Sequence, residues 1–288
     1  MEASTIRAPR LRGPVAPQPS AGSRLAEGFA APVRSGLSEM GDIARFGGQA
    51  LGEMRGVWRF TSEILRQVGI LITGSALIII FMEFMMGVEC GIEANYVLRG
   101  YGATAYSGTF TSYCGWREMI PYMFGYIFAA KIGCGLCAEI GSMRIQEELD
   151  AMESIGLNPM RYVIATRLLA VWLFLPAIFI IACGAHFVGN YMVLILQVKE
   201  VSQGAWENVH WVFSTPVDVL FSFTKVFLTC TVITVIGMYY GFRARGGPVG
   251  VGTATAKSMI LSLVLLHVIN GGLTMLFWGV KPNAPVGG

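Results

Sequence analysis

Charged residues are scarce in this chain of 288 residues. Asp, Glu, Lys and Arg make up 14% of it, whereas about 25% is usual for soluble domains. Hydrophobic residues make up 54% and gather in long runs, which indicates a membrane protein rather than a soluble protein with a large core. The net charge of +3 is too small to indicate binding to nucleic acid.

Several motifs of catalysis and nucleotide binding are also missing. No Gly-Lys-Ser/Thr occurs, so this chain binds no ATP through a P-loop. The three histidines, His186, His210 and His267, belong to no HExxH motif, and there is no GxSxG motif. We therefore expect no catalytic residue, no metal site and no cofactor in this chain.

What the sequence does contain is a series of apolar runs long enough to cross about 30 Å of hydrocarbon. They cover roughly residues 68–90, 119–141, 161–196, 216–241 and 255–279. The third run is too long for one untilted span and contains Pro176. We expect an all-α membrane protein with five transmembrane helices; splitting the third run near Gly184 would give six.

The N-terminal part differs from the rest. Residues 1–36 contain five arginines with several prolines and glycines, which predicts a disordered basic tail. Residues 37–60 are moderately apolar with charges on one side, and they predict an interfacial helix along the cytoplasmic surface, or alternatively a soluble linker helix. Residues 37–288 would then form one membrane domain.

The distribution of Lys and Arg predicts the orientation. Basic residues precede span 1 and occupy the connections between spans 2 and 3 and between spans 4 and 5. This places the N-terminus in the cytoplasm and the C-terminus outside. The loops at 91–115 and 197–214 would then face outward.

The connection between spans 2 and 3 carries a charged amphipathic segment, Met143 to Gly156. On one helix, Ile145, Leu149 and Met152 would share an apolar face, and Asn158-Pro159 follows the end of the segment. A short helix of this kind can dock on a soluble motor protein. Amphipathicity alone, however, favours an ordinary surface helix.

This region also resembles the signature of the MlaE/YrbE permeases, the membrane subunits of MCE-type ABC lipid transporters. The matching residues are Cys137-Ala138-Glu139-Ile140-Gly141-Ser142-Met143-Arg144, Glu147-Glu148-Leu149-Asp150-Ala151-Met152-Glu153, Pro159 and Arg167. The resemblance covers Leu37 to Trp278 and implies that the segment is a cytoplasmic coupling helix. Its candidate ATPase contacts are Arg144, Glu147, Glu148, Asp150, Met152 and Glu153.

Small residues and isolated charges mark the spans. Gly133, Cys137 and Gly141 recur every fourth residue, which favours close helix packing in lipid. Cys134-x-x-Cys137 has no further ligand nearby, so packing is favoured over a metal or redox site. Glu83, Lys131 and Glu139 are charged residues inside the first two spans. Such charges should face protein or water; Lys131 stands where the family has Arg, whereas Glu83 is particular to this chain.

A second group of polar residues is scattered through spans 2, 4 and 5. Trp116 to Pro121 resembles the family's Arg-Glu-Leu-Gly-Pro, with Ile120 in place of Gly, and Lys225 matches a family Lys. The resemblance implies that Arg117, Glu118 and Lys225 line an outward-opening lipid cavity, with Asn270 at a position where relatives often carry Asp. The alternative is a set of structural ion pairs, such as Glu83 with Lys225.

Two further features remain open at this stage. Cys90 and Cys114 flank the first outer loop, where an oxidising compartment permits either a disulfide or two free thiols. Residues 246–255 resemble the family's Gly-rich cytoplasmic turn, and we expect Thr253 to cap it.

The resemblance implies a permease subunit of an ABC lipid transporter in the bacterial inner membrane. Its substrate would be a phospholipid, a fatty acid or a related lipid. Its partners would be an ATPase dimer that binds ATP and Mg, a second permease and MCE-domain proteins outside. The departures at Ile120, Lys131, Val226 and Asn270 are similar to the actinobacterial branch, in which two different permeases pair. The alternatives are an intramembrane enzyme acting on lipids or peptides, and a scaffold that transports nothing.

Overall fold

The computed structural model describes residues 21–279, with side chains from residue 34 onward. The chain divides into two compact units, residues 1–44 and residues 45–288. Residues 1–20 of the predicted tail lie outside the described part. Residues 21–36 differ from the prediction, because helix α1 (Ala21–Glu53) already begins at Ala21.

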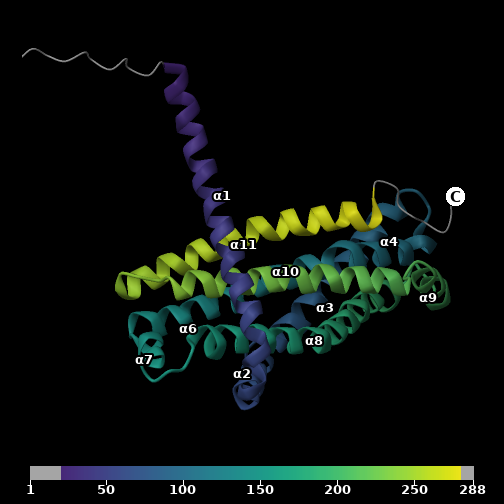
Figure 1. Ribbon diagram of the computed structural model, residues 1–288. Helices are drawn as coiled ribbons and strands as arrows, with labels where there is room; N and C mark the ends of the chain where they lie inside the picture. Colours follow the sequence, from purple (N-terminus) through teal and green to yellow (C-terminus); the bar gives the residue numbers. More distant parts are fainter. Residues whose placement is uncertain (1–20, 280–288) are drawn as a thin grey trace, which may run out of the picture. The chain divides into compact units, whose positions relative to one another are not determined.

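The described part of the chain is helical and contains no strand (Figure 1). After α1, a 3-10 helix (Met54–Phe60) leads into α2 (Thr61–Leu71). A π-helical turn (Ile72–Ala76) then joins α2 to α3 (Leu77–Arg99). The region predicted as one interfacial helix is thus helical throughout, and its position at a membrane surface stays a prediction.

The second long segment contains α4 (Ser107–Tyr113), the π-helical segment η4 (Cys114–Met119) and α5 (Ile120–Ile127). It continues through the π-helical segment η5 (Phe128–Gly133) into α6 (Cys134–Ile145), and the short helix α7 (Glu148–Ser154) follows. The third segment is π-helical at both ends (Met160–Ala165, Met192–Val198) around α8 (Thr166–Tyr191). Helices α9 (Gln203–Val212), α10 (Pro216–Phe242) and α11 (Gly247–Trp278) complete the described chain.

Five helical stretches are long and apolar enough to cross a membrane. They are Arg34–Arg99, Thr104–Ile145, Met160–Val198, Pro216–Phe242 and Gly247–Trp278. The third stretch runs through Gly184 and Pro176 without a break, so the alternative of six spans is wrong. The prediction of five spans in an all-α protein is confirmed.

Two helix pairs approach very closely, and glycines permit this. Where α3 packs along α8, a Cβ atom on Gly87 would lie 1.9 Å from the carbonyl oxygen of His186. Where α10 packs on the end of η5 and the start of α6, a Cβ atom on Gly237 would lie 2.5 Å from the carbonyl oxygen of Gly133. Only glycine fits at such contacts between backbones.

The Gly-rich segment before the last span has a different structure from the expected turn. The turn is confined to residues before Gly247, where α11 begins after Gly246 in a left-handed conformation (φ 87°). Thr253 lies inside α11 and donates to the carbonyl oxygen of Val249, so it does not cap the helix. Pro248 near the helix start is compatible with this, because the first turn needs no proline N–H.

Candidate functional site

The candidate site is a cluster of polar side chains between the spans, centred on Lys225 of α10. This side chain is completely buried. Its Nζ donates to the carbonyl oxygen of Arg117 and to the hydroxyl of Thr274, 2.7 Å away. The carboxylate of Glu118 lies 3.6 Å from Nζ. A charge in this position is tolerable because three neighbours compensate it.

Helix α11 contributes two residues one turn apart. The Thr274 hydroxyl lies 3.0 Å from Glu118 Oε1 and can alternatively donate to the Asn270 carbonyl oxygen. The buried Asn270 amide donates to Thr229 Oγ1 and to the Leu266 carbonyl oxygen. Glu118 is about one-third exposed (35%), so it is the member of this group that reaches the surface of the chain.

Arg117 lies beside a second acidic group. Its guanidinium stacks 3.8 Å above the ring of Tyr113, and its Nε lies 3.9 Å from Asp218 Oδ1. Asp218 also accepts a hydrogen bond of 2.6 Å from the Trp278 indole. Because Asp218 closes a capping box with Thr215, the start of α10 fixes the carboxylate that faces Arg117.

The structure therefore brings together Arg117, Glu118, Lys225 and Asn270, which the sequence analysis singled out. The residues that connect them were not predicted. The missed residues are Asp218, Thr274 and Trp278. Two signals were available in the sequence. Thr215-Pro216-x-Asp218 has the spacing of a helix start, and Thr274 lies one helical turn after Asn270.

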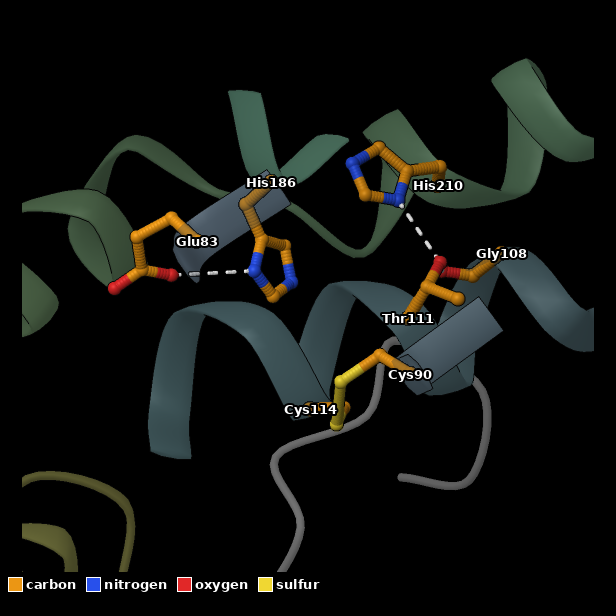
Figure 2. Close-up of a disulfide and its surroundings, with 7 residues drawn as sticks. All are labelled: Glu83, Cys90, Gly108, Thr111, Cys114, His186 and His210. Atoms are coloured by element: carbon orange, nitrogen blue, oxygen red, sulfur yellow. Dashed lines mark hydrogen bonds and ion pairs between the residues drawn. A yellow bond between two sulfur atoms is a disulfide. The ribbon is translucent and has the colours of Figure 1, made fainter. Parts of the chain in front are cut away.

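The suggested ion pair between Glu83 and Lys225 is wrong. Glu83 of α3 is buried with its carboxylate 3.4 Å from Nδ1 of the buried His186 of α8 (Figure 2). The close contact at Gly87 sets α3 directly on α8, so a side chain of α8 reaches Glu83. Lys225 instead meets groups from η4 and α11.

The predicted coupling segment is not one amphipathic helix. Helix α6 ends at Ile145, and Glu147 adopts a left-handed conformation (φ 60°) before α7 begins. Ile145 and Leu149 therefore belong to different helices. Leu149 is buried and holds α7 against the bundle, and Arg144 pairs with Asp150 at 2.6 Å.

The outer surface of α7 is acidic with one large apolar side chain. Glu147, Glu148 and Glu153 are exposed, and Ile155 just after the helix is 79% exposed. Met152 is half-buried. The exposed residues thus lie on a surface that a partner protein can reach.

Other predicted polar and packing residues lie on α6 and η5. Glu139 accepts a hydrogen bond of 2.6 Å from Arg167. Lys131 is exposed on η5 and forms no ion pair with a described residue. Gly133 and Gly141 are buried where α6 meets its neighbours: a Cβ on Gly141 would lie 2.9 Å from Val251.

The cysteines fall into two classes. Cys90 of α3 and Cys114 of η4 form a disulfide, with their Cα atoms 6.6 Å apart (Figure 2). Cys134 and Cys137 are free. No group of His, Cys, Asp or Glu residues suitable for a metal occurs among the described residues.

The loops predicted to face outward are tied together by a histidine that the sequence did not single out. His210 of α9 is buried, stacks on Trp206 at 4.7 Å and lies 3.3 Å from the hydroxyl of Thr111 of α4 (Figure 2). Burial lowers the pKa of His210 from 6.5 to about 4. The imidazole is therefore neutral at pH 7 and serves as part of the packing.

The comparisons with known proteins agree with this architecture. The family described as "Permease MlaE" matches residues 64–276. A probable ABC transporter permease protein of Rickettsia prowazekii is 25% identical over 221 residues, which cover 77% of this chain and 85% of the relative. A probable ABC transporter permease protein of Synechocystis is 28% identical over 228 residues, which cover 78% of this chain and 85% of the relative.

A third relative has a more specific description. The intermembrane phospholipid transport system permease protein MlaE of Haemophilus influenzae is 26% identical over 217 residues, which cover 75% of this chain and 83% of the relative. The family match includes all of η4, α7 and α10, and therefore most of the polar cluster. With its five candidate spans, the chain is a multi-pass membrane protein that belongs to the MlaE permease family.

Proposed function

We propose that this chain is the membrane subunit of an ABC transporter that moves phospholipid, fatty acid or a related lipid across or out of the bacterial inner membrane. The observation that carries the proposal is the family membership, together with the buried Lys225 cluster between the spans. The phospholipid transport system of the Haemophilus relative supports a lipid substrate.

In this proposal, Arg117, Glu118, Lys225 and Asn270 form the polar end of a lipid cavity. Lys225 is fully buried and already has three partners, so it orients the cluster from within. Glu118, one-third exposed, presents the cluster to the cavity. Buried intramembrane charges are costly and mark functional sites by default, which supports a transport role for this group.

The proposed complex has partners on both sides of the membrane. A cytoplasmic ATPase dimer, which binds ATP and Mg, docks on α7, where the exposed carboxylates of Glu148 and Glu153 meet basic residues of the motor. A second permease completes the membrane part, and MCE-domain proteins bind outside. The clustering of Lys and Arg supports a cytoplasmic N-terminus.

Replacing Glu148 and Glu153 with Lys tests the motor contact. These side chains are exposed and have no ion pair with a described residue, so the permease should fold normally. Asp150 and Arg144 are left unchanged because they pair with each other. We expect the ATPase to be lost from purified complexes, because the charge reversal repels its basic groups, and transport to stop.

The control reverses one charge elsewhere, with Glu207→Lys in the loop predicted to face outward, at a residue that forms no ion pair with a described residue. This variant should retain the ATPase. Undiminished co-purification of the ATPase with the α7 variant would contradict the assignment of α7 as the coupling helix.

A further inference from the structure

A hollow of about 390 Å³ lies beside the disulfide, apart from the Lys225 cluster. Its walls come from α3, α4 and η4, and the lining residues are Met86, Glu89, Cys90, Ile92, Glu93, Phe110, Cys114 and Met119. Its volume falls in the range of about 300–1,000 Å³ that is typical of small-molecule sites.

The walls of this hollow are mainly apolar and are fixed by a covalent bond. Met86, Ile92, Phe110 and Met119 contribute hydrocarbon, thioether and ring surface. The Cys90–Cys114 disulfide, which forms part of the wall, ties α3 to η4 (Figure 2). A site whose walls are held in place costs less ordering free energy when a ligand binds. Its apolar lining fits an alkyl chain.

Two carboxylates stand in this otherwise apolar lining. Glu89 and Glu93 are exposed and lie four residues apart, so they share one face of α3. Neither forms an ion pair with a described residue. The nearest basic residues in the sequence are engaged elsewhere: Arg99 pairs with Glu200 at 3.3 Å, and Arg117 stacks on Tyr113.

We propose that this hollow binds an amphiphile whose apolar chain fills the space and whose ammonium head group lies between Glu89 and Glu93. Two neighbouring carboxylates repel each other, and a cation between them relieves this repulsion. The inference rests on the proposed lipid transport and specifies one class within it, lipids with a primary ammonium group. In the predicted orientation, an ammonium head at this place would lie toward the outer end of span 1.

The test uses the full-length protein in vesicles with equal amounts of phosphatidylethanolamine and phosphatidylglycerol. Both lipids carry a phosphate; phosphatidylethanolamine adds a primary ammonium and has no net charge, whereas phosphatidylglycerol adds two hydroxyls and keeps a net negative charge. After extraction in mild detergent, mass spectrometry measures the retained lipid. We expect the wild type to enrich phosphatidylethanolamine roughly threefold, which corresponds to a charge pair at a partly exposed site. Glu89→Gln with Glu93→Gln should return the ratio to that of the vesicles.

Glu207→Gln is the control, because it removes a negative charge from outside the hollow at a residue that forms no ion pair with a described residue, and it should keep the enrichment. A second variant, Met86→Trp, fills the hollow and leaves both carboxylates in place; it should reduce the amount of phosphatidylethanolamine retained. The Glu89/Glu93 variant tests the charge of the hollow, and Met86→Trp tests its space. If one of these variants folds poorly, the other still tests the proposal.

Each remaining outcome overturns the inference. Retention of both lipids at the vesicle ratio, preference for phosphatidylglycerol, or enrichment that survives in the Glu89/Glu93 variant would refute an ammonium site while leaving lipid transport intact. If Met86→Trp retains as much phosphatidylethanolamine as the wild type, the hollow is not the binding place. If neither the wild type nor any variant retains lipid, the proposed lipid function fails as well.

Discussion

At the scale of single residues, the polar cluster shows how a lysine is kept among transmembrane helices. Lys225 has a carbonyl oxygen, a hydroxyl and a carboxylate within reach, and each comes from η4 or α11. Removal of the amine leaves these groups without their donor, and a half-satisfied buried network is costly. The carboxylate that pairs with Lys225 is the one whose removal can offset the stability lost when Lys225 is replaced.

Lys225→Met is therefore expected to lower the free energy of unfolding by about 1–3 kcal/mol, because Glu118 loses its cation. Adding Glu118→Gln should restore part of this loss, because no carboxylate is then left unpaired. Adding Glu83→Gln should restore nothing, since Glu83 lies beside His186. Thermal unfolding of the purified subunit in detergent measures all three variants.

The same variants separate the two roles of the cluster. If the cluster serves transport, the Lys225→Met and Glu118→Gln double variant regains stability and still transports poorly. Recovery of stability and transport together would show that the cluster is only structural. Equal rescue by Glu83→Gln would contradict the pairing seen here.

Residue pairs of this kind were the least predictable part of the site. The sequence indicated Lys225 and Glu118 through their resemblance to the family, and it indicated Glu83 as a charge inside a span. It could not say which charges meet, because pairing depends on the rotation and contacts of whole helices. The contact at Gly87 brings His186 to Glu83. The sequence does not show which helix packs against Gly87, because the apolar residues around it are compatible with several neighbours.

At the scale of elements, small residues determine which helices pack most closely. The predicted spacing of Gly133, Cys137 and Gly141 corresponds to a real packing face: a Cβ on Gly241 would lie 2.7 Å from the Cys137 carbonyl oxygen, as at Gly237 beside Gly133. The sequence revealed this face on α6. It did not reveal that the facing glycines belong to α10, because spacing describes one helix at a time.

Gly237→Ala should therefore destabilise the α6–α10 pair by about 1–3 kcal/mol, because the new methyl group overlaps backbone atoms that cannot move aside. The matched control is Gly135→Ala on α6, where a Cβ meets nothing within 4 Å. It should be neutral or stabilise the helix by about 0.5–1 kcal/mol. The midpoint of thermal unfolding in detergent compares the two variants.

An unchanged midpoint for Gly237→Ala would show that α6 and α10 can separate without cost.

The break at Glu147 is a different kind of local feature. Its residue type gives no warning of a left-handed conformation (φ 60°), since glutamate seldom adopts one. Amphipathic spacing alone therefore predicted one helix where the chain forms two.

At the scale of the whole molecule, hydropathy was the most reliable guide. Long apolar runs predicted five spans because, in lipid, a spanning helix must satisfy all its backbone hydrogen bonds internally. The over-long third run remains a single helical stretch, since neither Pro176 nor Gly184 outweighs that constraint. Charge distribution predicts the orientation on a separate physical basis, the preference of Lys and Arg for the cytoplasmic side.

Fusions to the C-terminus test that orientation. An odd number of spans with a cytoplasmic N-terminus places the C-terminus outside, so an alkaline phosphatase fusion there should be active and a green fluorescent protein fusion dark. Fusions that end the chain after Arg245, between α10 and α11, are the matched control and should give the reverse pair. An inactive phosphatase with bright fluorescence at the C-terminus would invert the assignment. It would place α7 outside and the Cys90–Cys114 disulfide in the cytoplasm, where a stable disulfide is not expected.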